Sequence, residues 1–293
     1  MRRLAVFFLP CAVAAQQPAA AEAWQLITPP QSSQVYARDG SLIGEIGKEW
    51  RTIVSIRTLP AYLANAFIAV EDRRFYSHNG VDMVGIAGAI KDNLLGSFRG
   101  ASTITQQLIG NMHPDLINRR DLSPMRKLRE QRAALEMERH YSKAQILEAY
   151  LNQINFGRGW YGVETAARHY FGKGAAQVTL AEAATLAALP KSPVQYDPGR
   201  NPGRAKNRRD AILDLMVAQK HITKDEGAAA KREPVRTVPA GGTSASAPYF
   251  VDAVRVAAEA AGVPVSQGGF RIMTGLDPAL QRAAVSALAD ETA

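Results

Sequence analysis

Apolar residues recur at intervals of three and four over most of the chain after Pro60, a spacing that predicts helices. We expect helices within residues 61–77, 81–96, 102–112, 123–141, 142–154, 161–172, 179–190, 201–220 and 223–233. Two helix starts carry cap signals. Ser123 precedes a proline at the first helical position, and Thr179 with Glu182 matches a capping box. The body of the protein is therefore predicted to be mainly α.

The two ends of the chain are predicted to contribute a small β annex. "VYARDGSLIGEIGKEWRTIVSI" (35–56) holds Asp39-Gly40 between β-prone runs, which is typical of a hairpin. Near the C-terminus, "GFRIMTG" (269–275) reads as a strand between one helix and another that starts from Asp277. "PAGGTSASAP" (239–248) has the composition of a flexible linker.

The pattern divides the chain into four parts. Residues 1–23 have basic residues, a short apolar run and small alanines, which suits a signal peptide or a short membrane anchor. Residues 24–58 form the hairpin annex and 59–236 the helical domain. Residues 237–293 are a linker and the start of a C-terminal domain that is missing or truncated. We expect the folded part to lie outside the cytoplasmic membrane.

The amino-acid composition indicates the class of binding partner but does not identify one partner. The 293 residues are 46% hydrophobic, enough for a substantial core, and 35 Lys and Arg against 27 Asp and Glu give a net charge of +8. Such a charge favours an anionic partner: phosphate groups, an acidic membrane surface or nucleic acid. Cys11 is the single cysteine, which excludes an intrachain disulfide or a cysteine zinc site.

The first candidate for chemistry is "EDRRFYSHNG" (71–80), which follows the apolar run "AFIAV". A Glu71 carboxylate held against Phe67 and Ile68 loses water, which raises its pKa towards the range of a general base. The plain alternative is a solvated helix end.

Two further stretches present groups suited to a phosphorylated sugar. "GASTITQQL" (100–108) crowds uncharged hydrogen-bonding side chains at a helix start, and they suit sugar hydroxyls or phosphate oxygens. Arg126, Lys127 and Glu130 share a helix face and suit a diphosphate. The alternatives are a capped polar helix and a surface ion pair. The basic run in "LPKSPVQYDPGRNPGRAKNRR" is interpreted as a solvated face.

The order and spacing of these stretches resemble the family-51 glycosyltransferases, the peptidoglycan glycan polymerases of bacteria. The five motif regions match "EDRRFYSHNG", "GASTITQQL", "RKLRE", "ILEAYLN" with "FGRGWYGVETAARHYFGK", and "LAEAATLAALPKSPVQYDP", between about Val35 and Met216. The flanking "VYARDGSLIGEI" and "TGLDPALQRAA" look like those of class A penicillin-binding proteins. The resemblance implies a lysozyme-like, mainly α fold whose groove separates a large lobe from a small membrane-facing lobe.

The same resemblance implies a reaction. Lipid II would be polymerised into β-1,4 glycan strands by inverting transfer, with release of undecaprenyl diphosphate. Glu71 matches the catalytic base and Glu130 the second essential acid. The positions matched to substrate binding are Asp72, Phe75, His78, Ser102, Thr103, Gln106, Gln107, Arg126, Lys127 and Asn152.

The resemblance also implies surroundings for the enzyme. The partners are lipid II and the nascent strand, the membrane surface and the wall-synthesis machinery, with no nucleic acid. The location is the outer face of the cytoplasmic membrane, in the periplasm. The sequence requires no cofactor, leaves Mg²⁺ or Mn²⁺ open, and identifies no metal ligands.

Two departures from the family stand out. Gly110 occupies a place where the family usually has a lysine that contacts the donor diphosphate, and we hypothesise that Arg119, Arg120 or Lys127 replaces it. Ser-x-x-Lys and Lys-Thr-Gly are absent, so we expect no transpeptidase activity from this chain.

Two other functions stay open at this point. A lysozyme-like muramidase would need a general acid and a second carboxylate at glycosidase spacing. A non-catalytic lipid II-binding scaffold would be consistent with Gly110.

Overall fold

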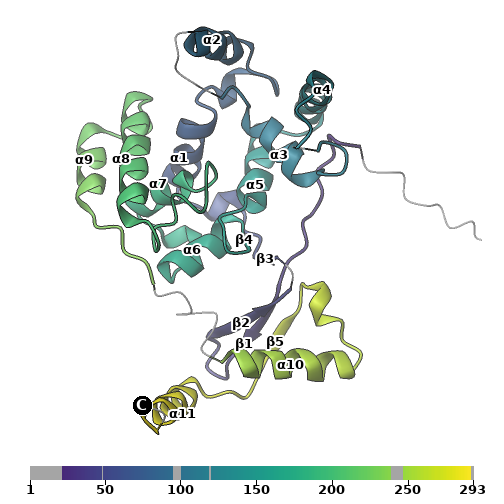
Figure 1. Cartoon of the computed structure of the whole chain (residues 1–293), viewed down its shortest axis with the longest axis vertical. Helices are drawn as coiled ribbons and strands as arrows, with labels where there is room; N and C mark the ends of the chain where they lie inside the picture. The colour runs from purple at the N-terminus through teal and green to yellow at the C-terminus, as the bar shows by residue number, and fades with distance from the viewer. Residues whose placement is uncertain (1–21, 48, 95–99, 119, 239–246, 292–293) are drawn as a thin grey trace, which may run out of the picture.

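The computed structural model describes residues 22–47, 49–94, 100–118, 120–238 and 247–291. The predicted signal or anchor and most of the linker at 239–248 lie outside them. Figure 1 shows a helical body above a smaller β annex. The prediction of a mainly α fold with an annex built from both ends is confirmed.

The helical body is organised around α1 (Ala61–Glu71), which packs against α7 (Leu180–Ala188) and α8 (Pro202–Ala218). Phe67 is fully buried and meets Tyr150 and Phe156 edge-on, so α1 runs through the main hydrophobic core. The remaining helices are α2 (Met83–Leu94), α3 (Ile104–Met112), α4 (Pro124–His140), α5 (Lys143–Gln153), α6 (Val163–Phe171) and α9 (Lys224–Arg232).

Helix α3 is the second element that matters for the site. It packs between α4 and α5, and its polar first turn faces the end of α1. Thr103 caps it with a complete capping box to Gln106. The predicted caps at Ser123 and at Thr179 are also present, on α4 and α7.

The annex is a three-stranded sheet with a core of its own. Strands β1 (Ser33–Tyr36) and β2 (Leu42–Ile46) form the predicted antiparallel hairpin, and β5 (Arg271–Met273) adds to β1 in parallel. Helix α10 (Pro248–Ala260) covers this sheet, and α11 (Pro278–Glu291) extends below it in Figure 1. A two-residue pairing of β3 (Trp50–Arg51) with β4 (Trp160–Tyr161) connects the annex segment to the helical body.

One helix prediction was wrong at its end. The pattern over 61–77 predicted a continuous helix, but α1 stops at Glu71 because Asp72 leaves helical geometry, with φ −156° and ψ 72°. Its side chain accepts the backbone N–H of Ile104 at the start of α3. Residues 73–82 then form a loop with one 3₁₀ turn, Phe75–Ser77. The break turns the chain back across the start of α3.

Gly80 closes this loop and permits it to touch α4. Its φ is +93°, and a Cβ atom there would lie 2.3 Å from the backbone oxygen of Ala134. We expect Gly80→Ala to lower the free energy of unfolding by roughly 2 to 4 kcal/mol, through backbone strain and overpacking. Urea denaturation measures the change. Gly88→Ala is the control, because its Cβ would meet open space on α2. A Gly80→Ala protein as stable as the Gly88→Ala protein would contradict this account of the loop.

Candidate functional site

A pocket of about 660 Å³ opens where the end of α1 meets α8 and the start of α3. Its apolar lining includes Val70, Leu215 and Ala218. Its polar lining includes Glu71, Arg73, Ser102, Gln107, Lys191 and Arg208. Three of the predicted site residues therefore face one cavity, together with three cations that were not predicted.

Glu71 is the last residue of α1, and the apolar helix carries its carboxylate to the pocket wall. The side chain is half-buried and accepts a hydrogen bond of 2.8 Å from Gln107 Nε2. Burial raises the pKa of Glu71 above its ordinary value. The Gln107 bond and the charges of Arg208 and Lys191 act in the opposite direction, and the neighbouring Asp72 adds to the rise.

The Gln107 amide is itself oriented. Its Oε1 accepts a hydrogen bond of 3.3 Å from the hydroxyl of Tyr150, so its Nε2 is directed at Glu71. Tyr150 lies on α5 and is fully buried. The carboxylate is thus held by a chain of two side chains that reaches into the core.

Asp72, His78 and Phe75 support the site from behind. Asp72 is buried, and both of its oxygens lie 3.0 Å from His78 Nε2. His78 Nδ1 accepts the Gly80 N–H at 3.2 Å, so we assign the ring proton to Nε2, which donates to Asp72. Phe75 is buried with no exposed surface. None of the three lines the pocket.

The second predicted acid lies in a separate cluster at the start of α4. Glu130 is buried and pairs with Arg126 Nη1 at 2.5 Å and with Lys127 Nζ. Lys127 also donates to Ser102 Oγ at 3.1 Å, and Ser102 lines the pocket. One carboxylate against two cations leaves the cluster with a net positive charge. It joins the edge of the Glu71 pocket through Ser102.

Thr103, Gln106 and Asn152 are turned into the structure. Thr103 Oγ1 donates to the Gly80 carbonyl at 2.7 Å, and Gln106 completes the α3 capping box. Asn152 is buried and exchanges hydrogen bonds of 3.0 and 2.9 Å with the backbone of Val54. These three side chains set the backbone around the site and do not line the pocket.

The sequence analysis missed three pocket cations: Arg73, Lys191 and Arg208. The basic run in "NPGRAKNRR" was interpreted as a solvated face, but α8 divides it. Lys206 pairs with Asp210, and Arg209 is fully buried, donating to the carbonyls of Lys231 and Glu233. Arg208 faces the pocket. The signal that could have found it is helical phase: Arg208, Leu215 and Gln219 recur at intervals of seven and four residues.

The proposed substitutes for the missing lysine are only partly placed. Gly110 is buried within α3, and Arg119 lies outside the described residues. Arg120 is exposed, and its backbone N–H bonds the Asn118 side chain. Lys127 is held by Glu130 and Ser102. The hypothesis that an arginine takes the place of the lysine stays a hypothesis.

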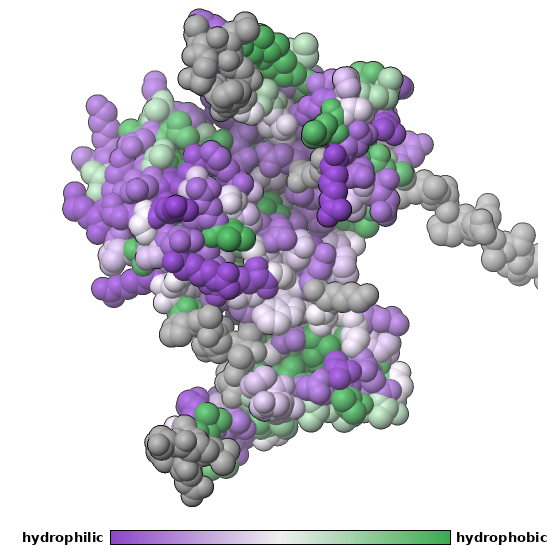
Figure 2. Space-filling view, in the orientation of Figure 1, coloured by the Kyte–Doolittle hydropathy of each residue, from purple (hydrophilic) through white to green (hydrophobic). Residues whose placement is uncertain are grey.

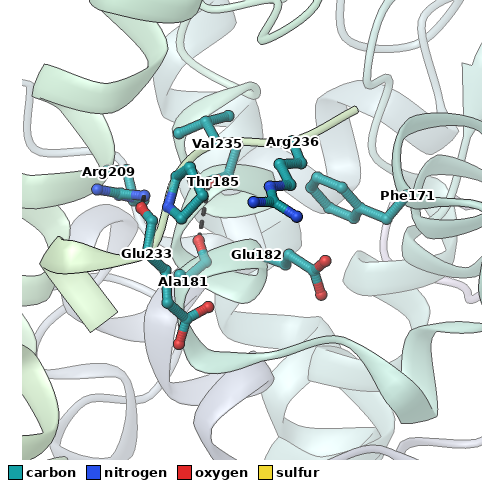
Figure 3. Close-up of a pocket in the computed structure, with 9 residues that line it drawn as sticks. Phe171, Ala181, Glu182, Thr185, Arg209, Glu233, Val235 and Arg236 are labelled. Atoms are coloured by element: carbon teal, nitrogen blue, oxygen red, sulfur yellow. Dashed lines mark hydrogen bonds between the residues drawn. The ribbon is translucent and has the colours of Figure 1, made fainter. Parts of the chain in front are cut away.

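A second pocket, of about 360 Å³, lies between α7 and the segment after α9 (Figure 3). Several of its polar side chains already have partners within the protein. Arg209 donates to the Glu233 carbonyl, Glu182 pairs with Lys173, and Thr185 donates to the Ala181 carbonyl. Arg236 points towards Glu182 in Figure 3. No predicted site residue lines this pocket, and we do not assign the chemistry to it.

Metal-binding groups do not gather in the part of the chain that the structure describes. There, no cluster of three His, Cys, Asp or Glu side chains is placed to hold an ion. In the described lining of the Glu71 pocket, Glu71 is the single carboxylate.

Comparisons with known proteins place most of the chain in one family. The transglycosylase family model matches residues 39–217. Penicillin-binding protein 1A of Aquifex aeolicus is 42% identical over 254 residues, covering 86% of this chain and 34% of that protein. Penicillin-binding protein 1A/1B of Bacillus subtilis is 38% identical over 267 residues, covering 86% and 28%. The chain spans about a third of the length of the curated relatives it matches.

Among solved structures, penicillin-binding protein 1A from Haemophilus influenzae aligns with a TM-score of 0.46 and 27% identity. The alignment covers 82% of this chain and 26% of that one.

The two pocket cations are expected to set the pKa of Glu71. Because Arg208 and Lys191 lower this pKa, Arg208→Met and Lys191→Met should each raise it. Carboxyl ¹³C NMR titration of the labelled glutamates measures the change, with Glu71→Gln identifying the resonance. Lys206→Met is the control on the same helix, since Lys206 pairs with Asp210. A Glu71 pKa that is unchanged in both pocket variants would show that these cations do not act on the carboxylate.

Proposed function

The chain belongs to the transglycosylase family of the penicillin-binding proteins, and on that premise we propose that it polymerises lipid II into β-1,4 glycan strands. Undecaprenyl diphosphate is the leaving group. The observation that carries the proposal is the half-buried carboxylate of Glu71, with its raised pKa, in a pocket that also holds three cations.

The proposed reaction needs one base. Glu71 takes the proton from the 4-hydroxyl of the acceptor N-acetylglucosamine while that oxygen attacks the anomeric carbon of the growing strand. The bond from that carbon to the diphosphate breaks on the opposite face, so the configuration inverts. The proton then leaves Glu71 for solvent. A raised pKa matches the base to this task, because a weakly basic carboxylate transfers protons poorly near neutral pH.

Besides their effect on the pKa of Glu71, the cations would bind diphosphate, since the growing strand and the acceptor lipid II each carry one. Negative charge grows on the leaving diphosphate in the transition state, so fixed cations stabilise that state more than the ground state. We assign Arg126 and Lys127, with Ser102, to the donor diphosphate. Lys191 and Arg208 lie beside Glu71 from the other direction and are assigned to the acceptor.

The pocket favours transfer over hydrolysis by a muramidase mechanism. A glycosidase places two carboxyl groups on either side of the scissile bond. In this pocket Glu71 is the single described carboxylate, and the neighbouring Asp72 is engaged by His78 and the Ile104 N–H. A diphosphate leaves without protonation once cations neutralise it, so transfer needs no second carboxyl group beside the scissile bond.

The surface at the far end of the helical body fits a lipid-carried substrate. Met83, Val84 and Ile90 on α2 are more than half exposed. Leu122, Met125 and Leu128, at and before α4, are also exposed. Figure 2 shows hydrophobic surface in both places. Across the described residues, no helix has the length and hydropathy of a membrane span. We propose that this end rests on the outer face of the cytoplasmic membrane.

Glu71→Gln should abolish polymerisation and leave folding intact. The amide keeps the shape and removes the base, and loss of a general base typically lowers the rate by about 10²- to 10⁴-fold. Gel separation of the products from labelled lipid II measures the turnover. Near-normal turnover by the folded variant would mean that Glu71 is not the base. A wild-type chain that binds lipid II without making polymer would instead support the scaffold function.

Membrane contact is tested on the chain without residues 1–23. Val84→Ser with Ile90→Ser should reduce co-sedimentation with vesicles of anionic phospholipid, by about tenfold for each side chain that enters the lipid. Tyr249→Ser with Val256→Ser is the control, because both residues are exposed on α10 of the annex. Equal losses in the two double variants would contradict a specific role for α2.

A further inference from the structure

The position of the Glu71 carboxylate depends on how α3 is seated. Gln107 gives Glu71 its hydrogen bond, and Gln107 lies on α3 while Glu71 ends α1. A displacement of α3 along or around its axis would therefore lengthen that bond. The groups that anchor the first turn of α3 consequently bear on the chemistry, although they do not touch the pocket.

One anchor comes from α1 itself. Asp72 Oδ2 accepts the N–H of Ile104, the first residue of α3, at 3.0 Å. His78 holds the same carboxylate from the other side. This contact ties the end of one helix to the start of the next.

A second anchor comes from a buried acid that has no part in the proposed reaction. Glu138, in the last turn of α4, has a side chain that is 4% exposed. Its Oε1 accepts a hydrogen bond of 2.5 Å from the hydroxyl of Thr105, the second residue of α3. Its Oε2 lies 2.6 Å from Lys143 Nζ, at the start of α5. Helices α3, α4 and α5 therefore meet at one carboxylate.

The two anchors also approach each other. Glu138 Oε1 lies 4.0 Å from His78 Nδ1, while His78 Nε2 contacts Asp72. Lys143 Nζ in turn lies 4.4 Å from the centre of the buried Phe75 ring. The loop after Glu71 and the start of α3 are thus held by two neighbouring groups of polar side chains, Asp72 with His78 and Glu138 with Thr105 and Lys143.

A buried ion pair is a poor means of gaining stability. Removing two charges from water costs about as much as their attraction returns, and a well-packed apolar pair often serves as well. Charged groups do fix relative positions, because their hydrogen bonds demand particular distances and directions. The Glu138–Lys143 pair is accordingly better suited to setting the position of α3 than to stabilising the fold.

We infer that Glu138, held by Lys143 and acting through Thr105, is a positioning residue that keeps Gln107 on the catalytic carboxylate. The inference rests on the proposed role of Glu71 as base. The hydrogen bond from Gln107 lowers the pKa of Glu71. Loss of the anchor loosens that bond, so the pKa of Glu71 rises further. The charged groups that face Glu71 are otherwise unchanged: Asp72 beside it, Arg73 in the loop, Lys191 after α7 and Arg208 on α8.

The variants Glu138→Met and Thr105→Val cut the same hydrogen bond from its two ends, because Met offers no oxygen to accept the Thr105 hydroxyl and Val offers no hydroxyl to donate. Each should lower kcat for lipid II polymerisation by about 10- to 100-fold, the size of effect expected from a small misplacement at the reacting centre. KM should change little, since neither residue lines the pocket. The acid limb of the kcat/KM profile should move to higher pH in both.

The double variant is the sharper measurement. If both residues act through one bond, the combined loss in Glu138→Met with Thr105→Val equals that of either alone. The matched control is Glu164→Met. Glu164 is a buried acid on α6 that accepts the Ala175 N–H at 2.7 Å and pairs with Arg168 at 2.6 Å, away from the site. The substitution at Glu164 should lower the melting temperature and leave the acid limb of the kcat/KM profile at the same pH.

A readout without turnover separates this inference from the proposed function. The ¹³C titration of Glu71 should report a higher pKa in both single variants, whether or not the wild-type chain polymerises lipid II. Failure of the wild-type chain to make polymer would overturn the proposed function alone. An unchanged Glu71 pKa in correctly folded Glu138→Met and Thr105→Val proteins would overturn the positioning role. Additive losses in the double variant would overturn it too.

Discussion

The junction between α1 and α3 is the constraint on which the rest of the site depends. Helix α1 ends at Glu71 because Asp72 leaves helical geometry and gives its carboxylate to the first N–H of α3. That contact places the carboxylate of Glu71, the proposed base, at the end of a buried helix, where Gln107 Nε2 lies 2.8 Å from it. The glycine at position 80 and the cap at Thr103 lie in the same junction and meet at one hydrogen bond. The loop therefore helps to hold the Glu71 carboxylate in place and is more than a connection between helices.

The electrostatics of the pocket balance two opposing effects. Burial destabilises the ionised form of Glu71, which raises its pKa and makes the carboxylate a stronger base. Arg208 and Lys191 stabilise the ionised form and lower this pKa. The same cations are what a diphosphate needs. A pocket with one carboxylate and several cations thus suits the proposed reaction, which removes one proton and releases one anion. The cluster of Glu130 with Arg126 and Lys127 adds a net positive charge beside Ser102, at the edge of the pocket.

Much of this arrangement could be predicted from the sequence, because local residue patterns determine the elements and the spacing of the motifs indicates the family. The mainly α body, the hairpin at Asp39-Gly40 and a strand within residues 269–275 follow local patterns. The grouping of Glu71 with Gln107 and Ser102 was implied by the family resemblance, and the parallel pairing of β5 with β1 was not predicted. Other features could not be predicted. The end of α1 depends on a partner 32 residues away in the chain, the N–H of Ile104. The division of the basic run on α8 depends on which side of that helix faces the groove. Burial of Phe75 and Asn152 is likewise set by packing between distant segments. The contacts of Glu138 with Thr105 and Lys143 required the structure, because three helices supply them.

The central claim is that one carboxylate performs a single displacement on a lipid-linked sugar diphosphate. The most direct measurement is the anomeric configuration of the linkage made from lipid II, read by NMR on the polymer that the purified chain produces. Lipid II presents the muramyl unit as an α-linked diphosphate, so a single displacement assisted by Glu71 predicts β linkages throughout. Retained α linkages would require a covalent intermediate and a second nucleophile, and would contradict the account.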